Sequence, residues 1–319
     1  MLIAVLLVPL SASARKMQQH FKHQLPPGNY SGICALGDSL FAVVDDKAPE
    51  DGFYLFRISI DEAQRRITEV ENLGYRSSGL PNRDMEGICY RPATKTLFIS
   101  GEADNRVYEY TLDGQRTGQQ LQMPAFIGRA ETNYGLEALT YDHRRHLFIT
   151  TTEHPLPGDS MLRIMTFSDD MTPNRVFLYR PDEPLSEKHI HGVSALCALS
   201  DGRLLVLERQ VRIPRLKIGA SALTRIYEVV LPEVLPYSLP DVLADSLPNM
   251  LFDTLAATSQ QPLEKRLVTE FKTRLNLFSR QFANFEGLCQ VSPSLVLLVA
   301  DSQNRHKGIL KDWFRLVEL

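Results

Sequence analysis

The chain has 319 residues, of which 44% are hydrophobic and 23% are charged, and this balance allows one large domain or two ordinary ones with a hydrophobic core. Its formal net charge of −3 arises from 35 Lys and Arg against 38 Asp and Glu, so no basic excess favours a nucleic-acid backbone or an anionic membrane surface. We therefore expect no nucleic-acid partner.

The first 14 residues form an uncharged, apolar segment that ends in Ala12, Ser13 and Ala14. An apolar run of this length with a small-x-small ending is typical of a signal peptide, although the usual basic residues before the run are missing. We predict an exported protein, periplasmic or secreted, with a buried N-terminal strand as the competing interpretation. No other apolar run approaches the roughly 18 residues that a spanning helix needs, so no transmembrane span is expected.

One short pattern recurs along the chain and is followed each time by a second apolar strand. The five copies begin at Ser31, Glu86, Glu137, Ser194 and Glu286. Most copies continue into a third and a fourth alternating strand, and four short strands in each unit of about fifty residues are typical of a β-propeller blade. We predict a single all-β propeller domain over residues 15–319, with five blades favoured and six possible.

Two parts of the chain depart from the repeat. Ala195 and Gly287, which are equivalent positions, lie 92 residues apart, and the excess falls on a Pro-punctuated, helix-like stretch at about residues 232–262. We predict a helical insertion on one rim there, which could form a lid or hide a degenerate sixth blade. The fifth copy ends after its third strand at Leu319, so we expect the segment 16–25 to supply the missing strand and close the ring.

Acidic residues stand at corresponding places in the copies. The first strand of a blade lines the central channel, and three copies place a glutamate at its head. Further acids follow the second strand, 14 to 16 residues later, at Asp46, Glu102, Glu153, Glu208 and Asp301. Because two antiparallel strands return to the same end of the blade, we expect every blade to deliver an acid to one mouth of the channel.

Converging carboxylates repel one another unless a cation lies among them, and Ca²⁺ takes carboxylate ligands of this kind. We therefore predict a calcium site with the ligands Glu86, Glu137, Glu286, Glu102 and Asp301. The competing interpretation is that these acids cap turns or pair with neighbouring arginines on the rim.

Basic residues follow several of the same acids. Arg106 and Arg305 occupy equivalent places in the strings Glu102 to Arg106 and Asp301 to Arg305, and Arg209 follows Glu208 directly. We predict that these three arginines bind the phosphate or carboxylate group of a small anionic ligand or ester substrate. Simple charge compensation is the alternative, and it is the stronger one for Arg209.

The four cysteines stand three residues after the head of their repeats, at Cys34, Cys89, Cys197 and Cys289. One equivalent position on separate blades suits a small apolar packing residue and not a disulfide framework, so we expect free, buried thiols. The chain has no GxSxG elbow and no glycine-rich phosphate loop, and we assign no catalytic residue.

Several strings between about Tyr30 and Leu319 resemble the phytase-like esterase domain of bacterial exported proteins, above all the strings 204–209 (LLVLER) and 284–287 (NFEG). The resemblance implies a propeller fold, an envelope or extracellular location and a phosphoester or ester hydrolase activity. Calcium-dependent propeller phytases carry an Asp-Asp-Pro-Ala motif, from which Asp45 to Pro49 departs, so no phytase active site is carried over. A similarity to gluconolactonase-type propellers is limited to Glu86-Gly87 and Glu286-Gly287.

Together these features predict a monomeric, exported, metal-dependent hydrolase that acts on phosphoester or ester bonds at the channel mouth. Two alternatives stay open. The first is a non-catalytic propeller that binds a ligand or a protein, because a fold does not fix a function. The second is a calcium-dependent, lactonase-like enzyme.

Overall fold

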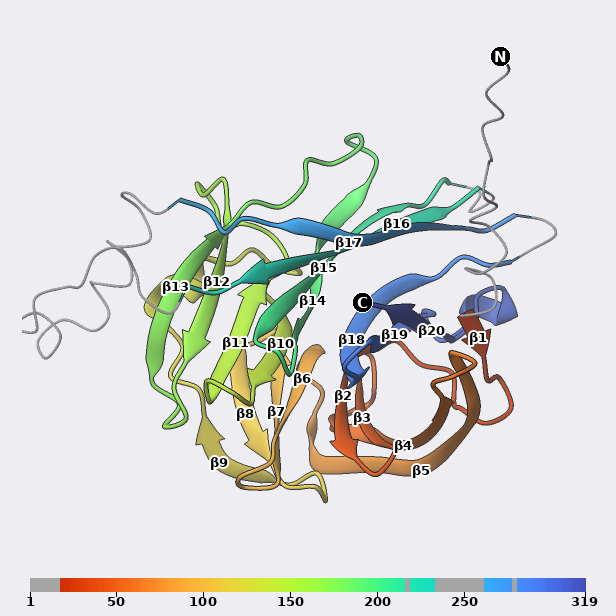
Figure 1. The fold of residues 1–319 in the computed structure, drawn as a ribbon, viewed down its shortest axis with the longest axis horizontal. Coiled ribbons are helices and arrows are strands. Elements are labelled where there is room, and N and C mark those ends of the chain that lie inside the picture. The colour runs from red at the N-terminus through yellow and green to blue at the C-terminus, as the bar shows by residue number, and fades with distance from the viewer. Residues whose placement is uncertain (1–17, 216–218, 233–260, 277–279) are drawn as a thin grey trace, which may run out of the picture.

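The computed structural model describes residues 18–215, 219–232, 261–276 and 280–319, which form a five-bladed β-propeller (Figure 1). Each blade is a four-stranded antiparallel sheet. Blade 1 holds β2 (Tyr30–Gly37), β3 (Leu40–Asp45), β4 (Glu50–Asp61) and β5 (Arg66–Pro81). Blade 2 holds β6 (Met85–Arg91), β7 (Thr96–Gly101), β8 (Arg106–Tyr110) and β9 (Arg116–Gln120). Blade 3 holds β10 (Leu136–Asp142), β11 (Leu147–Thr152), β12 (Leu162–Phe167) and β13 (Pro173–Tyr179).

The remaining two blades complete the ring. Blade 4 holds β14 (Ile190–Ala198), β15 (Arg203–Arg212), β16 (Ser221–Val230) and β17 (Arg266–Arg274). Blade 5 holds β18 (Asn284–Ser292), β19 (Leu295–Asp301), β20 (Trp313–Glu318) and the N-terminal β1 (Gln18–His20). Two short 3-10 helices, η1 (Ala125–Arg129) and η3 (His306–Gly308), lie in connecting loops.

The ring is closed by strands from the two ends of the chain. β1 pairs antiparallel with β20, so that Gln18 lies opposite Arg315 and His20 opposite Trp313. The prediction of a propeller closed by the N-terminal segment is therefore confirmed, and the described residues form five blades. The expected signal peptide and nearly all of the expected helical insertion lie outside the described residues.

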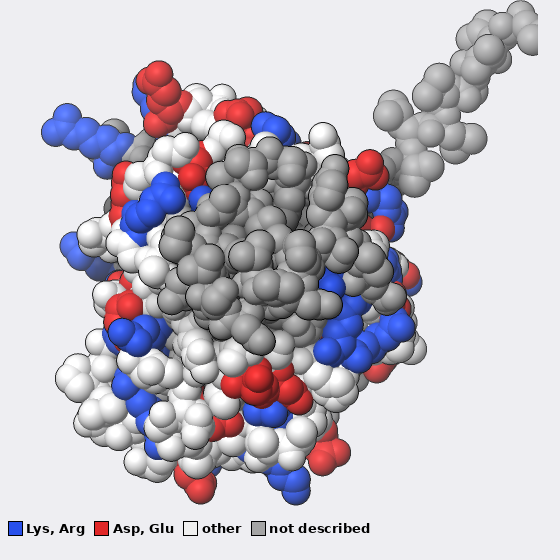
Figure 2. Space-filling model, turned by 90° about the vertical axis from the view of Figure 1, so that its left-hand side faces the viewer, with Lys and Arg blue, Asp and Glu red and all other residues white. Residues whose placement is uncertain are grey.

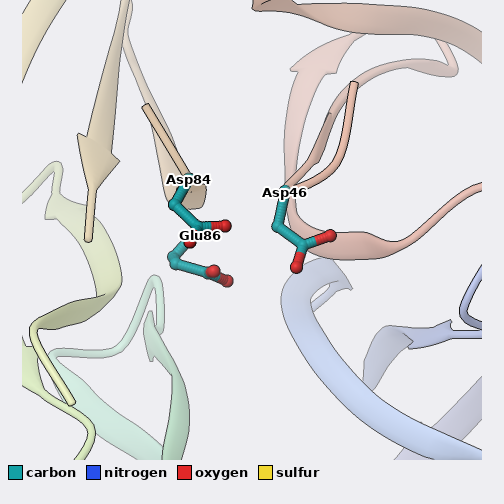
Figure 3. A group of neighbouring side chains, drawn as sticks. All are labelled: Asp46, Asp84 and Glu86. Carbon is teal, nitrogen blue, oxygen red and sulfur yellow. The ribbon is translucent and has the colours of Figure 1, made fainter. Parts of the chain in front are cut away.

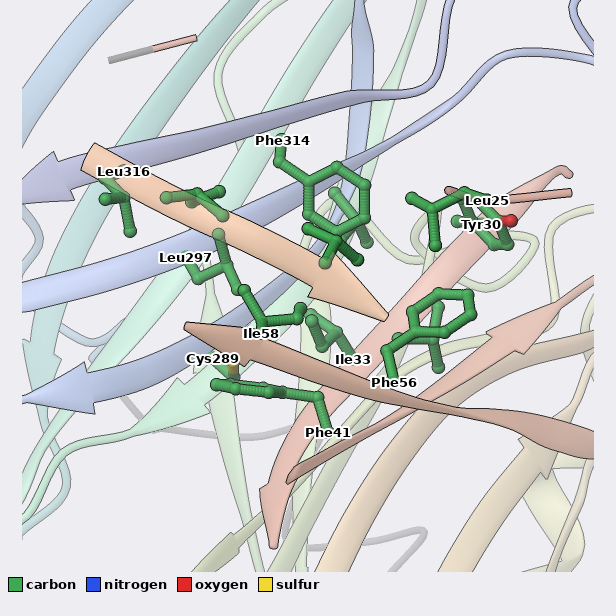
Figure 4. Packing of buried hydrophobic residues seen from close by; sticks show 14 of the residues in the cluster. Leu25, Tyr30, Ile33, Phe41, Phe56, Ile58, Cys289, Leu297, Phe314 and Leu316 are labelled. Carbon is green, nitrogen blue, oxygen red and sulfur yellow. The ribbon is translucent and has the colours of Figure 1, made fainter. Parts of the chain in front are cut away.

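The hydrophobic core lies between neighbouring blades. Figure 4 shows the cluster where blade 5 meets blade 1, in which Phe41 and Phe56 of blade 1 pack with Leu297, Phe314 and Leu316 of blade 5. All five side chains are buried, and burial of one such side chain stabilises the fold by about 1.5–3 kcal/mol. These contacts fix the blades relative to one another, and so fix the positions of the strands that line the channel.

The innermost strands approach one another closely around the axis. A Cβ atom on Gly87 would lie 2.5 Å from the backbone nitrogen of Leu139, and one on Gly32 would lie 2.3 Å from the carbonyl oxygen of Glu86. The residue after the head of each copy must therefore be glycine or another small residue. This close approach brings the head residues of the five blades to one end of a narrow channel.

The four cysteines are free and buried, as predicted. They line a second hollow of about 530 Å³ around the same channel, three residues along the inner strands from the acidic heads. Burial raises the pKa of the Cys197 thiol to about 12, and it raises the pKa of Cys34, Cys89 and Cys289 as well. These thiols stay protonated at neutral pH and fill space.

The outer surface carries charges of both signs. On the face that Figure 2 shows, the coloured atoms of Lys and Arg are interspersed with those of Asp and Glu, without one large field of a single sign. Among the residues that the structure describes, no helix has the length and hydrophobicity needed to cross a membrane.

Candidate metal centre at the channel mouth

The head residue of each copy lies in a β-bulge at one end of the channel. The pairing of β10 with β11 skips Glu137, and the corresponding pairings skip Glu86 and Glu286. A bulge leaves one residue out of the ladder and changes the direction of its side chain. The three glutamates are buried, with exposed fractions between 5% and 7%. The bulges thus bring three carboxylates from three blades into the protein interior.

Two blades carry serine at this position. The Ser31 hydroxyl donates a hydrogen bond to the carbonyl oxygen of Met85 (2.7 Å), and the Ser194 hydroxyl donates one to that of Phe285 (3.4 Å). These serines bridge to the backbone of a neighbouring blade and leave the acidic groups to the other three blades.

The strand register defines a second ring of equivalent side chains at the end of the second strands. These positions are occupied by Asp46, Glu102, Glu153, Arg209 and Asp301. The expectation that every blade delivers an acid is therefore wrong for blade 4. Glu208 lies opposite Val193 and its carboxylate accepts hydrogen bonds from Tyr179 Oη, Lys265 Nζ (2.7 Å) and Asp182 N (2.8 Å).

Arg209 lies among the carboxylates of three blades. Its Nη2 is 3.2 Å from Glu137 Oε1 and 3.1 Å from Glu153 Oε1, and its Nη1 is 2.7 Å from Glu286 Oε1. Its side chain is only 12% exposed. Although burial opposes the charge, the carboxylates of Glu286, Glu153 and Glu137 raise the pKa of Arg209 above its ordinary value, so this guanidinium is a fixed cation.

Two groups of three acids have oxygens close enough to share one ion. One oxygen from each of Asp46, Asp84 and Glu86 lies within 4.8 Å of the others, and the same holds for a second group. The second group consists of Glu102, Glu137 and Glu153. Figure 3 shows the first group, with Asp84 and Glu86 on one side and Asp46 facing them from the neighbouring blade.

The two groups differ in the cation that already contacts them. Arg209 contacts two members of the second group and is itself buried. The first group is contacted by Lys47, whose Nζ lies 3.1 Å from Asp46 Oδ2 and 2.5 Å from Asp84 Oδ1. The Lys47 side chain is 53% exposed, so its flexible ammonium can move into water when another cation arrives. The group Asp46, Asp84 and Glu86 is therefore the better candidate for a metal ion.

Burial makes these acids hard to ionise. It is the largest cause of the raised pKa of Glu86, followed by the negative charges of Glu137, Asp46 and Glu286. Burial likewise raises the pKa of Asp46 to about 7 and that of Asp301 to about 6. A divalent cation bound among these groups would favour their ionised form and reverse this effect.

The five predicted metal ligands all lie near this mouth, but in different settings. Glu102 accepts a hydrogen bond from the backbone of Gly135 (3.1 Å) and belongs to the second group of acids. Asp301 Oδ1 accepts one from Gln303 N (2.6 Å), and its charge raises the pKa of Glu286 and of Asp46. Their role as calcium ligands stays a prediction.

The sequence analysis did not assign a ligand role to Asp46, Asp84 or Glu153. Asp46 and Glu153 follow second strands and were noticed only as members of a series. Asp84 stands two residues before Glu86, the spacing that returns a side chain to the same face of an extended chain. That spacing was the signal that could have identified it.

The other two predicted arginines make contacts outside the acidic group. Arg106 is exposed at the start of β8 and its Nη1 donates to Gln120 Oε1 (3.3 Å). Arg305 Nε donates to Asp312 Oδ2 (2.5 Å), a fully buried carboxylate, and its Nη2 donates to the carbonyl oxygen of Leu25 (2.7 Å). A substrate-binding role for either stays a prediction.

An aromatic cluster lies beside Glu153 on the rim. The His154 ring stacks on Tyr134 with 4.1 Å between centroids, and the His191 ring lies 4.8 Å from His154. Burial lowers the pKa of both histidines. They are neutral at pH 7 and offer flat, uncharged surfaces at the entrance.

A family model described as "Phytase-like: Esterase-like activity of phytase" matches residues 26–302. A search of curated proteins gives no match. Solved structures with a similar fold include a streptogramin B lyase (11% identity, TM-score 0.42, covering 95% of this chain and 97% of that one). They also include a luciferin-regenerating enzyme (10%, 0.46, 94% and 95%) and a nidogen/laminin complex (13%, 0.40, 91% and 83%). Likeness at this level says nothing about what this chain binds.

Proposed function

The chain belongs to the phytase-like family, esterase-like activity of phytase, and on that premise we propose that it is an exported, calcium-dependent hydrolase of phosphoester or ester bonds, periplasmic or secreted. One observation carries the proposal. Carboxylates from four blades converge on one mouth of the channel, and they outnumber the basic side chains, Arg209 and Lys47, that contact them.

The first acidic group fits a calcium ion in donor type and spacing. Ca²⁺ takes oxygen ligands at about 2.3–2.6 Å, so two oxygens on one ion lie up to roughly 5 Å apart. The oxygens of Asp46, Asp84 and Glu86 lie within 4.8 Å of one another, and the group contains no sulfur or nitrogen ligand. Glu86 would be the innermost ligand because its side chain is the most deeply buried of the three.

When bound, calcium would polarise the ester or phosphoester oxygen and lower the pKa of a water molecule. Hydrolysis adds that water across the bond, so that the alcohol leaves with a proton and the acid keeps the hydroxyl oxygen. The protein's own part is to hold the anionic group of the substrate, for which Arg209 supplies a guanidinium fixed by Glu137, Glu153 and Glu286.

A non-catalytic binding propeller is the second candidate function. Arg209 supports it, because this residue gives Glu137, Glu153 and Glu286 a charge partner without any metal. In that case the converging acids would shape a polar mouth that binds a cationic or hydrogen-bonding ligand.

Hydrolysis of p-nitrophenyl phosphate and p-nitrophenyl acetate by the purified protein separates the two candidates. We expect release of p-nitrophenol in millimolar Ca²⁺ and at least a tenfold lower rate after a chelator has removed the ion, with activity restored when Ca²⁺ is returned. A rate equal to that of buffer in all conditions, for both substrates, would reject the hydrolase and favour the binding propeller.

Calcium should also change how stability depends on pH. In chelator, the pKa of Asp46 is raised from 3.8 to about 7, and the pKa of Glu86, Glu137 and Glu286 is raised as well. The folded state therefore binds more protons than the unfolded state, so stability falls as pH rises from about 4 through 7. We expect the melting temperature in chelator to fall between pH 5 and pH 8, and calcium to raise it more at pH 8 than at pH 5. An equal calcium effect at both values would contradict the assignment.

A further inference from the structure

A largely apolar hollow lies beside the channel mouth, between blade 4 and the loop that joins β19 to β20. It has a volume of about 480 Å³, within the range of roughly 300–1,000 Å³ that small-molecule sites occupy. Its apolar lining consists of Val211, Ile213, Ala220, Leu275, Phe282, Ile309 and Leu310. Val211, Ala220, Leu275 and Phe282 belong to one buried cluster, so the hollow has a packed apolar floor.

Two polar residues of the hollow connect it to the candidate metal centre. Asn284 and Asp301 both line it. Asn284 Nδ2 donates to Glu286 Oε1 (2.7 Å), and its Oδ1 accepts from Arg209 Nη1 (3.3 Å). A molecule in the hollow would therefore have its polar end next to the groups proposed to hold calcium and the substrate anion.

One wall of the hollow is a loop in an unusual backbone conformation. Gln303, Asn304, Arg305, His306 and Lys307 all have positive φ, between 31° and 59°. Residues other than glycine rarely adopt this conformation, and it persists only where surrounding contacts enforce it. Such segments are concentrated at ligand sites, because a wall held in place keeps a hollow open.

Arg305 is the main contact that enforces the loop. Its guanidinium binds the buried carboxylate of Asp312 and the carbonyl oxygen of Leu25, while its backbone nitrogen donates to Ser302 Oγ (3.0 Å). The loop is thus tied to blade 5 and to the segment that follows β1. This gives Arg305 a positioning role in place of direct contact with the anion.

We propose that this hollow binds the hydrophobic part of the substrate, so that the protein selects esters or phosphoesters of compact aromatic or branched alcohols. The proposal rests on the function proposed above. A fully hydroxylated or multiply phosphorylated alcohol would leave the lining of Ile213, Phe282 and Leu310 in contact with polar groups. A hydrocarbon group would remove that lining from water, at about 25 cal/mol for each Å² buried.

Binding of two non-hydrolysable anions tests the proposal independently of turnover. Benzylphosphonate and methylphosphonate carry the same acid and differ by one phenyl ring. We expect calorimetry to show at least tenfold tighter binding of benzylphosphonate in the presence of Ca²⁺. The double substitution Ile213→Ser and Ile309→Ser should reduce the ratio to below about threefold. Both side chains are partly exposed, 44% and 37%, so the fold should tolerate the change.

The matched control places the same substitutions elsewhere on the surface. Val230→Ser with Leu267→Ser changes two exposed apolar residues, 60% and 46% exposed, that do not line the hollow. This variant should keep the full preference for benzylphosphonate. Equal binding of the two phosphonates, no binding of either, or an equal loss of preference in both variants would overturn the proposal.

The same data distinguish this proposal from the proposed function. A protein that hydrolyses no ester but prefers benzylphosphonate, and loses the preference with Ile213→Ser and Ile309→Ser, has the hydrophobic site without the hydrolase. A protein that hydrolyses p-nitrophenyl esters in calcium but binds both phosphonates equally has the hydrolase without this site.

Discussion

Glu86→Gln should lower calcium affinity and calcium-dependent hydrolysis by about 100-fold each. Loss of a group that only orients a metal ligand costs about 10- to 100-fold, so loss of a ligand charge should reach at least the upper end of that range. Glu86 is skipped by the β6–β7 ladder, buried at 7% exposure, and shares its oxygen neighbourhood with Asp46 and Asp84. The measurements are a calorimetric calcium titration and kcat/KM for p-nitrophenyl phosphate.

The stability of the same variant provides a second test. Without calcium the substitution removes a buried like charge, so the variant should be at least as stable as the parent in chelator at pH 8. Glu69→Gln, which neutralises an exposed glutamate of β5, is the matched control and should leave both affinity and rate unchanged. Full calcium affinity in Glu86→Gln would remove Glu86 from the site, whatever its effect on stability.

The fold could be predicted from the sequence because its information is local and repeated. Each blade announces itself by a head residue, a small residue and an apolar pair of strands, and the fifth unit visibly lacks a strand. The closing strand β1 was inferred from that missing strand and is observed opposite β20. The interface between blades 5 and 1, which includes Leu25 and Phe314, then follows from closure of the ring.

The site was harder to predict because one residue decides which way a side chain faces. Side chains alternate along a strand, so a shift of one position exchanges the channel side for the opposite side. The acid of blade 4 was counted as Glu208, but the register places Arg209 at the equivalent position. A spacing of 15 residues from Ser194 agrees with the 15 and 16 of the other blades, so the numbers favoured Arg209 once the bulge was considered.

The hydrophobic hollow could not be predicted from the sequence at all. Its walls come from the end of β15, from residues before β16 and β18, and from the loop 303–310, which are far apart in the chain. Only the packing of blade 4 against blade 5 brings them together. Arg305 shows the same limit, because its partners Asp312 and Leu25 were not recognisable from the pattern that linked it to Arg106.

Arg209→Met should reduce the free energy of unfolding at pH 8 by about 3–5 kcal/mol, the usual cost of removing one partner from a buried ion pair. The substitution leaves Glu137, Glu153 and Glu286 buried without the guanidinium that contacts all three. Urea unfolding in chelator measures the change. Arg212→Met, at an exposed position near the end of the same strand, is the control and should have little effect.

The pH dependence of this loss identifies its electrostatic cause. Without Arg209 the pKa of the three carboxyls rises further, so the folded state takes up protons and part of the lost stability should return at pH 5. Adding Glu153→Gln should restore part of it at pH 8, whereas Arg209→Lys should not restore full stability, because one ammonium cannot replace the planar fork. A loss that is equal at pH 5 and pH 8 would instead indicate lost packing.

Calcium provides the last step of the same experiment. If the acids form a site whose charge Arg209 only partly balances, excess Ca²⁺ should reduce the instability of Arg209→Met at pH 8, because the ion can bind to the group that the guanidinium has left. If calcium stabilises neither the variant nor the parent, the converging carboxylates are balanced by Arg209 and by protons alone. The channel mouth is then a binding surface, and the hydrolase proposal loses the observation that carries it.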